Sequence, residues 1–304
     1  MDNLTHSLVG AVLGQCGLKR KTGLAMPALI IGANLPDVDA ACFFWLDGVE
    51  HLAFRRGITH GPPAWFLLPL VLAGALYGWD RWQAKRGKRP DDRLPVNFTW
   101  LYLLSLIGCL THPAMDWMNV YGVRLLAPFS QQWFYGDVLF IIDLFLWMLL
   151  IGGVWFSLRR EKRGGEWRKP ARITLAVMLA YIGLNAAITH VREAEHAGEG
   201  EVVIASPPPV LFWQREIITG ANGRYAIDGE PVGDFDLTEA DKADLAAALP
   251  EAAPFLFWSR VPLVRVADDG RYLLTDARYL GRETGSFTVE LPAEICAPQE
   301  PPVP

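Results

Sequence analysis

The chain has 304 residues, of which 51% are hydrophobic, and it carries a formal net charge of −5 at pH 7. Its mean hydropathy of +0.18 favours a membrane protein, but soluble proteins also reach this value. The choice between the two classes therefore depends on the individual segments. Nucleic-acid binding is disfavoured, because the net charge is negative and the basic residues cluster in short loops that membrane topology already explains.

Six apolar segments predict a mostly α-helical protein with a polytopic membrane domain. Crossing about 30 Å of hydrocarbon takes roughly 20 apolar residues. Four segments approach this length: 63–79, 98–119, 137–158 and 172–190. Two earlier segments, at about 4–18 and 24–46, are interrupted, since the first is short and the second contains Pro36, Asp37 and Asp39. We therefore predict about six passes, some of them short or broken, within residues 1–194.

Basic residues predict which side of the membrane each loop faces. Short loops rich in Lys and Arg stay in the cytoplasm, which applies to the loops at 19–21, 80–97 and 158–172. No basic region precedes the first apolar segment, so that segment lacks the pattern of a cleavable secretory signal. Six passes threaded through these loops place the amino terminus, and everything after about residue 190, on the outer side.

The sequence changes character at about residue 195, where the apolar segments stop and a proline-rich stretch at 206–209 follows, typical of a stiff linker. Short alternating or aromatic-rich segments, separated by Asn-Gly and Asp-Gly turn signals, are typical of antiparallel strands. They lie at 210–219, 223–228, 259–266, 271–276 and 286–291. One helix is predicted at about 238–248, with Thr238 as its N-cap. Residues 195–304 are thus expected to form a small β-rich soluble domain on the outer side.

Four histidines, His6, His51, His60 and His112, fall among apolar segments and beside acidic motifs such as that at 34–39. The predicted topology places all of them toward the outer side. Ionisable groups at membrane depth are costly and usually persist there for function. Divalent metals such as zinc use mixed His and Asp shells that leave a position for water, whereas structural zinc prefers cysteine. The set therefore indicates a catalytic metal site.

The pair His112 and Asp116 has the most specific spacing. Residues four apart stack on one face of a helix, with Cβ atoms about 5 to 6 Å apart. Pro113 either kinks this helix or begins it, and in both cases the two side chains can point at one cavity. Taken singly, each candidate also has a structural explanation: Asp37 and Asp39 as caps, and the histidines as surface or interfacial residues.

Five motifs carry a family resemblance: Asp2-Asn-Leu-Thr-His6, Leu35-Pro-Asp37-Val-Asp39, Arg56-Gly-Ile-Thr-His60, Thr111-His112-x-x-x-Asp116 and Trp133-Phe-Tyr-Gly-Asp137. Together they resemble the YdjM-type family of membrane-bound metal-dependent hydrolases. The order of the histidines and aspartates is further similar to that of zinc-dependent phospholipase C, which implies zinc-assisted phosphodiester hydrolysis.

The resemblance also implies roles for individual residues. It assigns metal ligation to His6, Asp37, His60, His112 and Asp116, with His51 as a less favoured ligand. It leaves Asp39 and Asp137 as completing ligands or catalytic bases. The implied cofactor is a divalent metal, with zinc favoured, as one or two ions.

We hypothesise a hydrolase of the bacterial inner membrane whose ion activates water against a phosphoester or other ester in a lipid or lipid-linked substrate. Two alternatives stay open. One is a non-enzymatic membrane protein in which the same groups bind a structural ion or line a polar cavity. The other is an ion-coupled transporter whose path includes intramembrane aspartates, among them Asp143, which is equally explained as a polar contact between helices.

Overall fold

The computed structural model describes residues 1–280 and 287–296 and divides into two compact units. The membrane unit comprises Met1–Asp39, Arg56–Ile188 and Pro207–Gln214. The sheet unit comprises Ala40–Arg55, Thr189–Ser206 and the described part of Arg215–Pro304. The units interleave in sequence, so each is built from several separate stretches of the chain.

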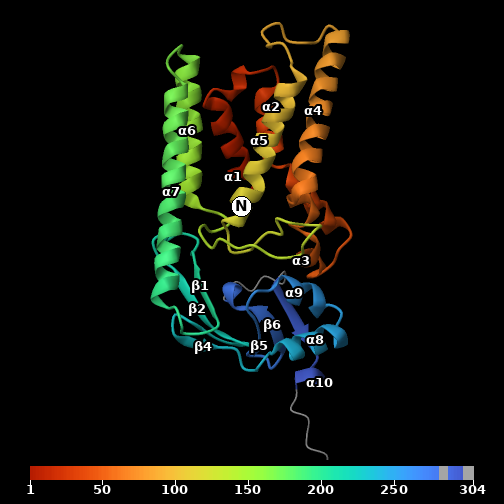
Figure 1. Ribbon diagram of the computed structural model, residues 1–304, viewed down its shortest axis with the longest axis vertical. Helices are drawn as coiled ribbons and strands as arrows, with labels where there is room; N and C mark the ends of the chain where they lie inside the picture. The colour runs from red at the N-terminus through yellow and green to blue at the C-terminus, as the bar shows by residue number, and fades with distance from the viewer. Residues whose placement is uncertain (281–286, 297–304) are drawn as a thin grey trace, which may run out of the picture. The chain divides into compact units, whose positions relative to one another are not determined.

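Helices make up the membrane unit (Figure 1). In chain order they are α1 (Asn3–Gln15), the 3-10 helix η1 (Leu18–Arg20), α2 (Ala25–Gly32), η2 (Leu35–Phe44), η3 (Ile58–His60), α4 (Pro62–Lys85), α5 (Phe98–Trp117), α6 (Leu144–Lys162) and α7 (Arg168–Glu195). Two of them, η2 and α7, continue past the boundary into the sheet unit. An irregular segment, residues 118–143, joins α5 to α6.

Among the described residues, three helices are long and apolar enough to cross a membrane: α4, α5 and α7. The pair α2 and η2 is bent by 51° at a short break and makes a fourth candidate if it forms one broken span. The prediction of a helical membrane protein is confirmed, but the count of about six passes is not. Two helices account for the difference: α1 has 13 residues, short for a span, and α6 begins at Leu144 instead of about 137.

The late start of α6 follows from its cap. Asp143 is the N-cap, and its Oδ1 accepts a hydrogen bond from the backbone N–H of Leu146 at 2.8 Å. Its other oxygen, Oδ2, accepts a hydrogen bond from the hydroxyl of Tyr181 on α7 at 2.8 Å. Asp143 therefore ends the irregular segment and connects α6 to α7. This is a polar contact between helices, one of the two explanations that the sequence analysis left open for Asp143.

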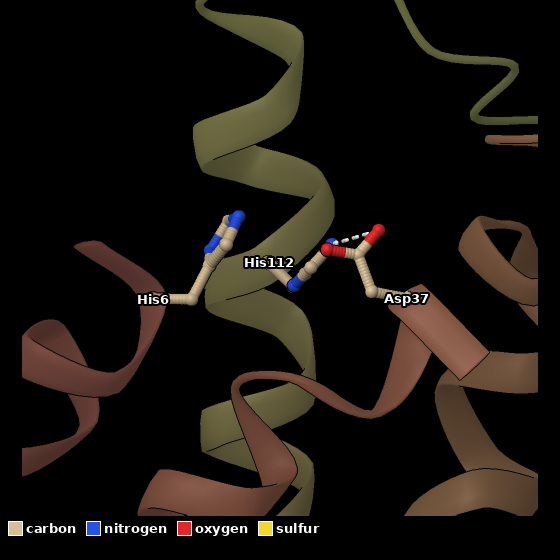
Figure 2. Close-up of side chains that lie close together, drawn as sticks. All are labelled: His6, Asp37 and His112. Carbon is tan, nitrogen blue, oxygen red and sulfur yellow. Dashed lines mark ion pairs between the residues drawn. The ribbon is translucent and has the colours of Figure 1, made fainter. Parts of the chain in front are cut away.

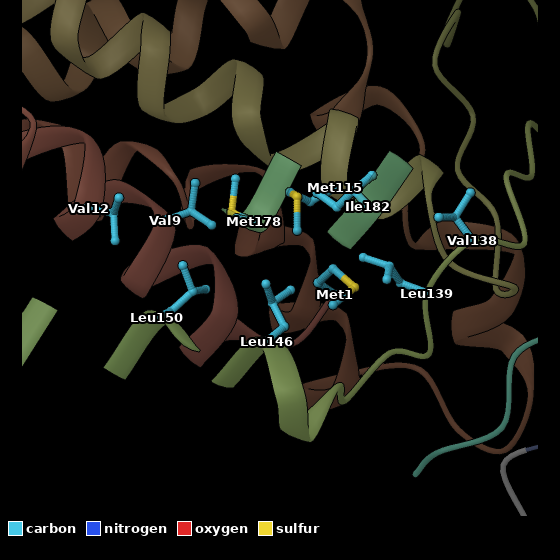
Figure 3. Close-up of a cluster of buried hydrophobic side chains, with 10 residues drawn as sticks. All are labelled: Met1, Val9, Val12, Met115, Val138, Leu139, Leu146, Leu150, Met178 and Ile182. Carbon is cyan, nitrogen blue, oxygen red and sulfur yellow. The ribbon is translucent and has the colours of Figure 1, made fainter. Parts of the chain in front are cut away.

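A hydrophobic core joins α1, α5, α6 and α7 (Figure 3). Its members are Met1, Val9, Val12, Met115, Val138, Leu139, Leu146, Leu150, Met178 and Ile182. The chain returns to this unit at residues 207–214, within and beyond the stretch predicted as a linker. There the ring of Phe212 packs against Phe145 and Tyr181, with 4.9 and 5.2 Å between ring centroids.

Glycines let α1, α2 and α5 approach one another at backbone distance. A Cβ atom on Gly10 of α1 would lie 2.8 Å from the carbonyl oxygen of Leu29 in α2, and one on Gly108 of α5 would lie 2.5 Å from the same oxygen. Real Cβ atoms do not approach that closely, so only glycine fits both positions. His6 lies one helical turn before Gly10 and His112 one turn after Gly108, so the close packing places both histidines beside α2.

The sheet unit contains two antiparallel sheets, which confirms the predicted small antiparallel sheet region. The first has the order β1 (Val202–Ser206), β2 (Glu216–Ala221), β3 (Arg224–Ile227) and β4 (Glu230–Val232), and the second has the order β5 (Pro262–Val266), β6 (Tyr272–Asp276) and β7 (Thr288–Leu291). In the first sheet Ile204 pairs with Ile218, and both are buried in one core with Val261 and Leu263.

The helix predicted at about 238–248 is confirmed as α8 (Glu239–Ala248), which Thr238 caps through a capping box with Asp241. The sequence prediction missed two strands, β1 and β4, and three helices, α3 (Glu50–Phe54), α9 (Ala252–Trp258) and α10 (Ala293–Cys296). The strand predicted from residue 210 begins only at Glu216. Ser286, at the start of the last predicted strand, lies outside the described residues.

A buried ion pair lies at the end of β6, where η4 (Ala277–Tyr279) begins. The guanidinium of Arg278 donates to both carboxylate oxygens of Asp276 at 2.8 Å, and both side chains are buried. Burial alone would raise the pKa of Asp276, but Arg278 and the hydroxyl of Ser259 hold this pKa below its usual value. The carboxylate therefore stays charged at neutral pH and fixes the turn after β6.

The glycine contact between α2 and α5 leads to a first prediction. We expect Gly108→Ala to destabilise the protein by about 1–3 kcal/mol, the usual cost of overpacking. Gly74→Ala on α4 is the matched control, because a Cβ there meets no described atom within 4 Å and alanine favours helix. Thermal unfolding of both variants in detergent measures the difference. Equal unfolding temperatures for Gly108→Ala and the wild type would contradict the backbone contact.

Candidate metal centre

Five predicted ligands meet in the membrane unit from four separate elements. α1 carries His6, η2 carries Asp37 in its first turn, η3 ends on His60, and α5 carries His112 and Asp116. Figure 2 shows His6, Asp37 and His112 pointing toward one another. The side chains of both α5 residues, His6 and His60 are completely buried, and that of Asp37 is partly buried.

The spacing of the ligand atoms fits a small ion. The Nε2 atoms of His6 and His60 each lie 3.4 Å from an oxygen of Asp116. The Nε2 atom of His112 lies 3.6 Å from Asp116 Oδ2 and 3.7 Å from Asp37 Oδ1. Two atoms that bind one tetrahedral zinc ion at about 2.0–2.1 Å lie about 3.3–3.4 Å from each other.

These atoms form two overlapping groups within the described residues. The first contains His6, Asp37 and His112, and the second contains His60, His112 and Asp116. Within each group the ligand atoms lie within 4.8 Å of one another. His112 belongs to both groups, and its ring stacks on that of His6 with 3.8 Å between the ring centroids.

Three of the converging atoms, all of them histidine Nε2 atoms of the described residues, have no hydrogen-bond partner. In the described part of the chain, the Nε2 atoms of His6, His60 and His112 are buried and make no hydrogen bond. A buried polar atom without a hydrogen bond costs about 1–3 kcal/mol, so three of them facing one point require an explanation. A metal ion held between them would provide it, since a neutral imidazole binds metal through its free lone pair.

The break between α2 and η2 supplies the carbonyl that places a hydrogen on one ring nitrogen of His112. Its Nδ1 atom lies 2.7 Å from the carbonyl oxygen of Ala33, the C-cap of α2. A carbonyl can only accept, so Nδ1 carries the hydrogen and, in the neutral ring, Nε2 presents its lone pair toward Asp37 and Asp116. For His60, outside the spans, burial lowers the pKa, which favours the neutral ring that a metal ligand requires.

Arg56 is the main residue of the site that the sequence did not identify as functional. Its Nε lies 3.1 Å from Oδ2 of Asp116, and its Nη2 donates to Oδ1 of the same carboxylate at 3.3 Å. Its Nη1 donates to the side chain of Asn119 at 3.0 Å and to the carbonyl of Gly122 at 3.1 Å, while the guanidinium stacks over Tyr121. Arg56 thus holds Asp116 in place and ties the segment after α5 to it.

The electrostatic balance of the site favours a bound cation. Three carboxylates, those of Asp37, Asp39 and Asp116, lie around the three histidine rings and face one guanidinium, that of Arg56. The amino group of Met1 also contacts Asp116 Oδ1. Buried charges are stable only when paired, and the three carboxylates exceed these two cationic groups by one negative charge, which a bound cation would pair.

The remaining predicted residues lie outside the two groups. Asp39 accepts hydrogen bonds from the backbone N–H of Arg56 at 2.8 Å and from the hydroxyl of Thr59 at 3.0 Å. Asp137 is buried in the irregular segment with a positive φ of 51°. His51 lies on α3 in the sheet unit, where its Nδ1 donates to the carbonyl of Gly48 at 2.9 Å. The catalytic or ligand roles of these three residues stay predictions.

A family model described as YdjM inner membrane protein matches residues 1–191. The chain belongs to the YdjM inner membrane protein family. The match includes all five residues that meet at the site and ends within α7. The similarity to zinc-dependent phospholipase C stays a prediction.

The YdjM family chain is also similar to a curated protein, the uncharacterized protein YfhP of Bacillus subtilis (strain 168). The two sequences are 24% identical over 167 residues, which cover 52% of this chain and 47% of YfhP. The chain therefore spans about half the length of this relative. No solved structure matches.

Removing a ligand tests the site directly. We expect His112→Ala and Asp116→Asn to lose bound metal, measured by elemental analysis of protein purified with zinc, while both remain inserted in the membrane. Asp143→Asn is the matched control, because it also neutralises a buried aspartate of the membrane unit and asparagine caps helices as well as aspartate does. Unchanged metal content in His112→Ala would show that the cluster is not the metal site.

Proposed function

We propose that this YdjM family member is a membrane-bound, metal-dependent hydrolase of a phosphoester or other ester in a lipid or lipid-linked substrate. The proposal rests on the convergence of histidine Nε2 atoms and carboxylates in the buried interior of the membrane unit. The residues that would hold the ion are His6, Asp37, His60, His112 and Asp116. A bound divalent ion, with zinc favoured, lowers the pKa of water and polarises a phosphoryl or carbonyl oxygen.

The donor set supports a catalytic role over a structural one. Structural zinc sites are mostly closed shells rich in cysteine, and catalytic sites use His and carboxylate ligands with one open position. Both described groups consist of histidine and aspartate alone. Cys109, although buried on the same helix as His112 and Asp116, belongs to neither group.

The geometry of His112 limits how many ions can bind. Its Nδ1 is engaged with Ala33, so one lone pair, on Nε2, is available to both groups. One imidazole lone pair binds one ion. A single ion near His112 is therefore the simplest arrangement, since a second ion would have only His60 and Asp116, or only His6 and Asp37, without His112.

Apolar side chains next to the site support a lipid-like substrate. Ile58, two residues before His60, is 57% exposed, and Phe129 in the segment after α5 is 78% exposed. The backbone of this segment lies against η3, since a Cβ on Gly61 would overlap the carbonyl of Ala127. Exposed apolar residues beside a buried polar cluster suit a substrate that carries hydrocarbon chains.

The two alternatives predict different arrangements. An ion-coupled transporter needs ionisable residues spread along a path through the membrane. Here the five residues gather at one point, and Asp143 is engaged as a helix cap and by Tyr181. A structural ion would bind the same ligands but give no activity, so the activity measurement separates this alternative from the proposal.

We expect the zinc-loaded protein in lipid nanodiscs to hydrolyse a phosphodiester lipid or another ester in a membrane lipid extract. Chelation should abolish product release and added zinc should restore it, while Asp116→Asn should be inactive under all conditions. The readout is mass spectrometry of the released headgroup and lipid. Metal-loaded wild-type protein that leaves every lipid in the extract intact would favour the structural ion.

We further propose that the amino terminus and a carboxy-terminal domain of residues 195–304 face the outer side of a bacterial inner membrane, because the basic loops at 19–21, 80–97 and 158–172 favour the cytoplasm. In a background without native cysteines, Glu230→Cys should react with an impermeant maleimide in whole cells and Lys88→Cys should not. The opposite labelling pattern would reverse the orientation.

A further inference from the structure

The hydroxyl of Thr59 connects Asp39 to His60. Thr59 Oγ1 lies 3.0 Å from Oδ2 of Asp39 and 3.0 Å from Nδ1 of His60. On the other side of the imidazole, Nε2 faces Oδ2 of Asp116 at 3.4 Å. The three polar groups therefore form a chain that ends at the second group of candidate ligands.

The chemistry of the three groups fixes the direction of each hydrogen bond. An ionised carboxylate only accepts, so the single hydroxyl hydrogen of Thr59 goes to Asp39. The hydroxyl oxygen can then only accept from His60, which places a hydrogen on Nδ1 of the ring. In the neutral imidazole, Nε2 is left with its lone pair aimed at Asp116, as a metal ligand requires.

The same aspartate also fixes Arg56. Oδ2 of Asp39 accepts the backbone N–H of Arg56 at 2.8 Å, and the guanidinium of Arg56 holds both oxygens of Asp116. The chain turns sharply here, since Arg56 has a φ of 54°, before η3 begins. One carboxylate therefore positions two residues of the site, His60 at the end of η3 and Arg56 four residues earlier.

We propose that Thr59 and Asp39 are positioning residues that hold His60 in the Nδ1–H tautomer, with its Nε2 lone pair directed at the ion. This inference rests on the proposed metal site, and it replaces the roles of ligand or base for Asp39. His112 reaches the same state through a backbone carbonyl, Ala33, which no side-chain substitution removes. For His60 the Thr59 hydroxyl has the role that the Ala33 carbonyl has for His112, and a substitution of Thr59 can remove it.

Zinc affinity of the full-length protein, measured by competition with a chromogenic chelator, tests the inference. Partners of this kind usually change metal affinity by about 10–100-fold. We expect Thr59→Val, which keeps the shape of the side chain but lacks the hydroxyl, to bind zinc about 10–100-fold more weakly than the wild type. Thr59→Ser keeps the hydroxyl and should bind zinc with an affinity close to that of the wild type. Thr111→Val is the matched control, because it removes a hydroxyl beside His112 that donates only to its own helix, to Gly108 at 2.6 Å.

The tautomer itself is a second readout. In metal-free protein labelled with 15N-histidine, the His60 ring of the wild type and of Thr59→Ser should carry its hydrogen on Nδ1. Thr59→Val should shift the ring toward a mixture of tautomers. This measurement needs no metal, and on the wild type alone it stays decisive if Thr59→Val fails to fold.

Three results would overturn the inference: equal zinc affinity for Thr59→Val and wild type, an equal loss in Thr111→Val, or a wild-type His60 ring with its hydrogen on Nε2. A wild-type protein that binds no zinc would instead contradict the proposed function. The tautomer of its His60 would still decide whether the Thr59 hydroxyl orients the ring.

Discussion

The carboxylate of Asp116 is the group on which the rest of the site depends. It is completely buried on a helix that is long and apolar enough to cross a membrane, where an unpaired charge is costly. Arg56 neutralises it from one side, and the Nε2 atoms of His6, His60 and His112 face it from the others. These groups come from three parts of the chain, namely α1, the segment at 56–60 and α5 itself, so burial of this one charge explains why those parts meet.

The packing of the helices brings the ligands to Asp116. Gly10 and Gly108 let α1 and α5 touch the backbone of α2 near Leu29, one turn away from His6 and His112. Beyond this contact α2 ends, and the chain bends by 51° into η2. Irregular backbone at membrane depth is tolerated where it lines a polar interior. Here the break supplies two functional groups, the carbonyl of Ala33 and the carboxylate of Asp37.

Local features of the sequence predicted much of this arrangement. The apolar lengths of α4, α5 and α7 placed these helices correctly, and the spacing of four between His112 and Asp116 placed both on one face of α5. The predicted interruption of the segment at 24–46 is confirmed as a broken helix pair, but the break lies between Gly32 and Leu35, just before Pro36. The grouping of the five candidate ligands came from motif resemblance, and the structure brings these residues together.

The features that the sequence left out depend on contacts between distant residues. Arg56 looked like part of a motif around His60, because nothing in its neighbourhood shows that it would meet Asp116, 60 residues later. The sequence around Thr59 did not predict its role either, because that role follows from the distances of its hydroxyl to Asp39 and His60. The apolar run from 137 suggested a longer helix, but the irregular backbone extends to the cap at Asp143. Strand β1 lies before the stretch predicted as a linker and was missed for lack of turn signals.

The central claim, that these residues hold a metal ion, is tested most directly by a crystal structure of the zinc-loaded protein with anomalous diffraction measured at the zinc edge. The account predicts a peak about 2.0–2.2 Å from Nε2 of His112 and from a carboxylate oxygen of Asp116 or Asp37. Zinc-loaded crystals with no peak at the cluster, and with water or protein groups hydrogen-bonded to all three Nε2 atoms, would contradict it.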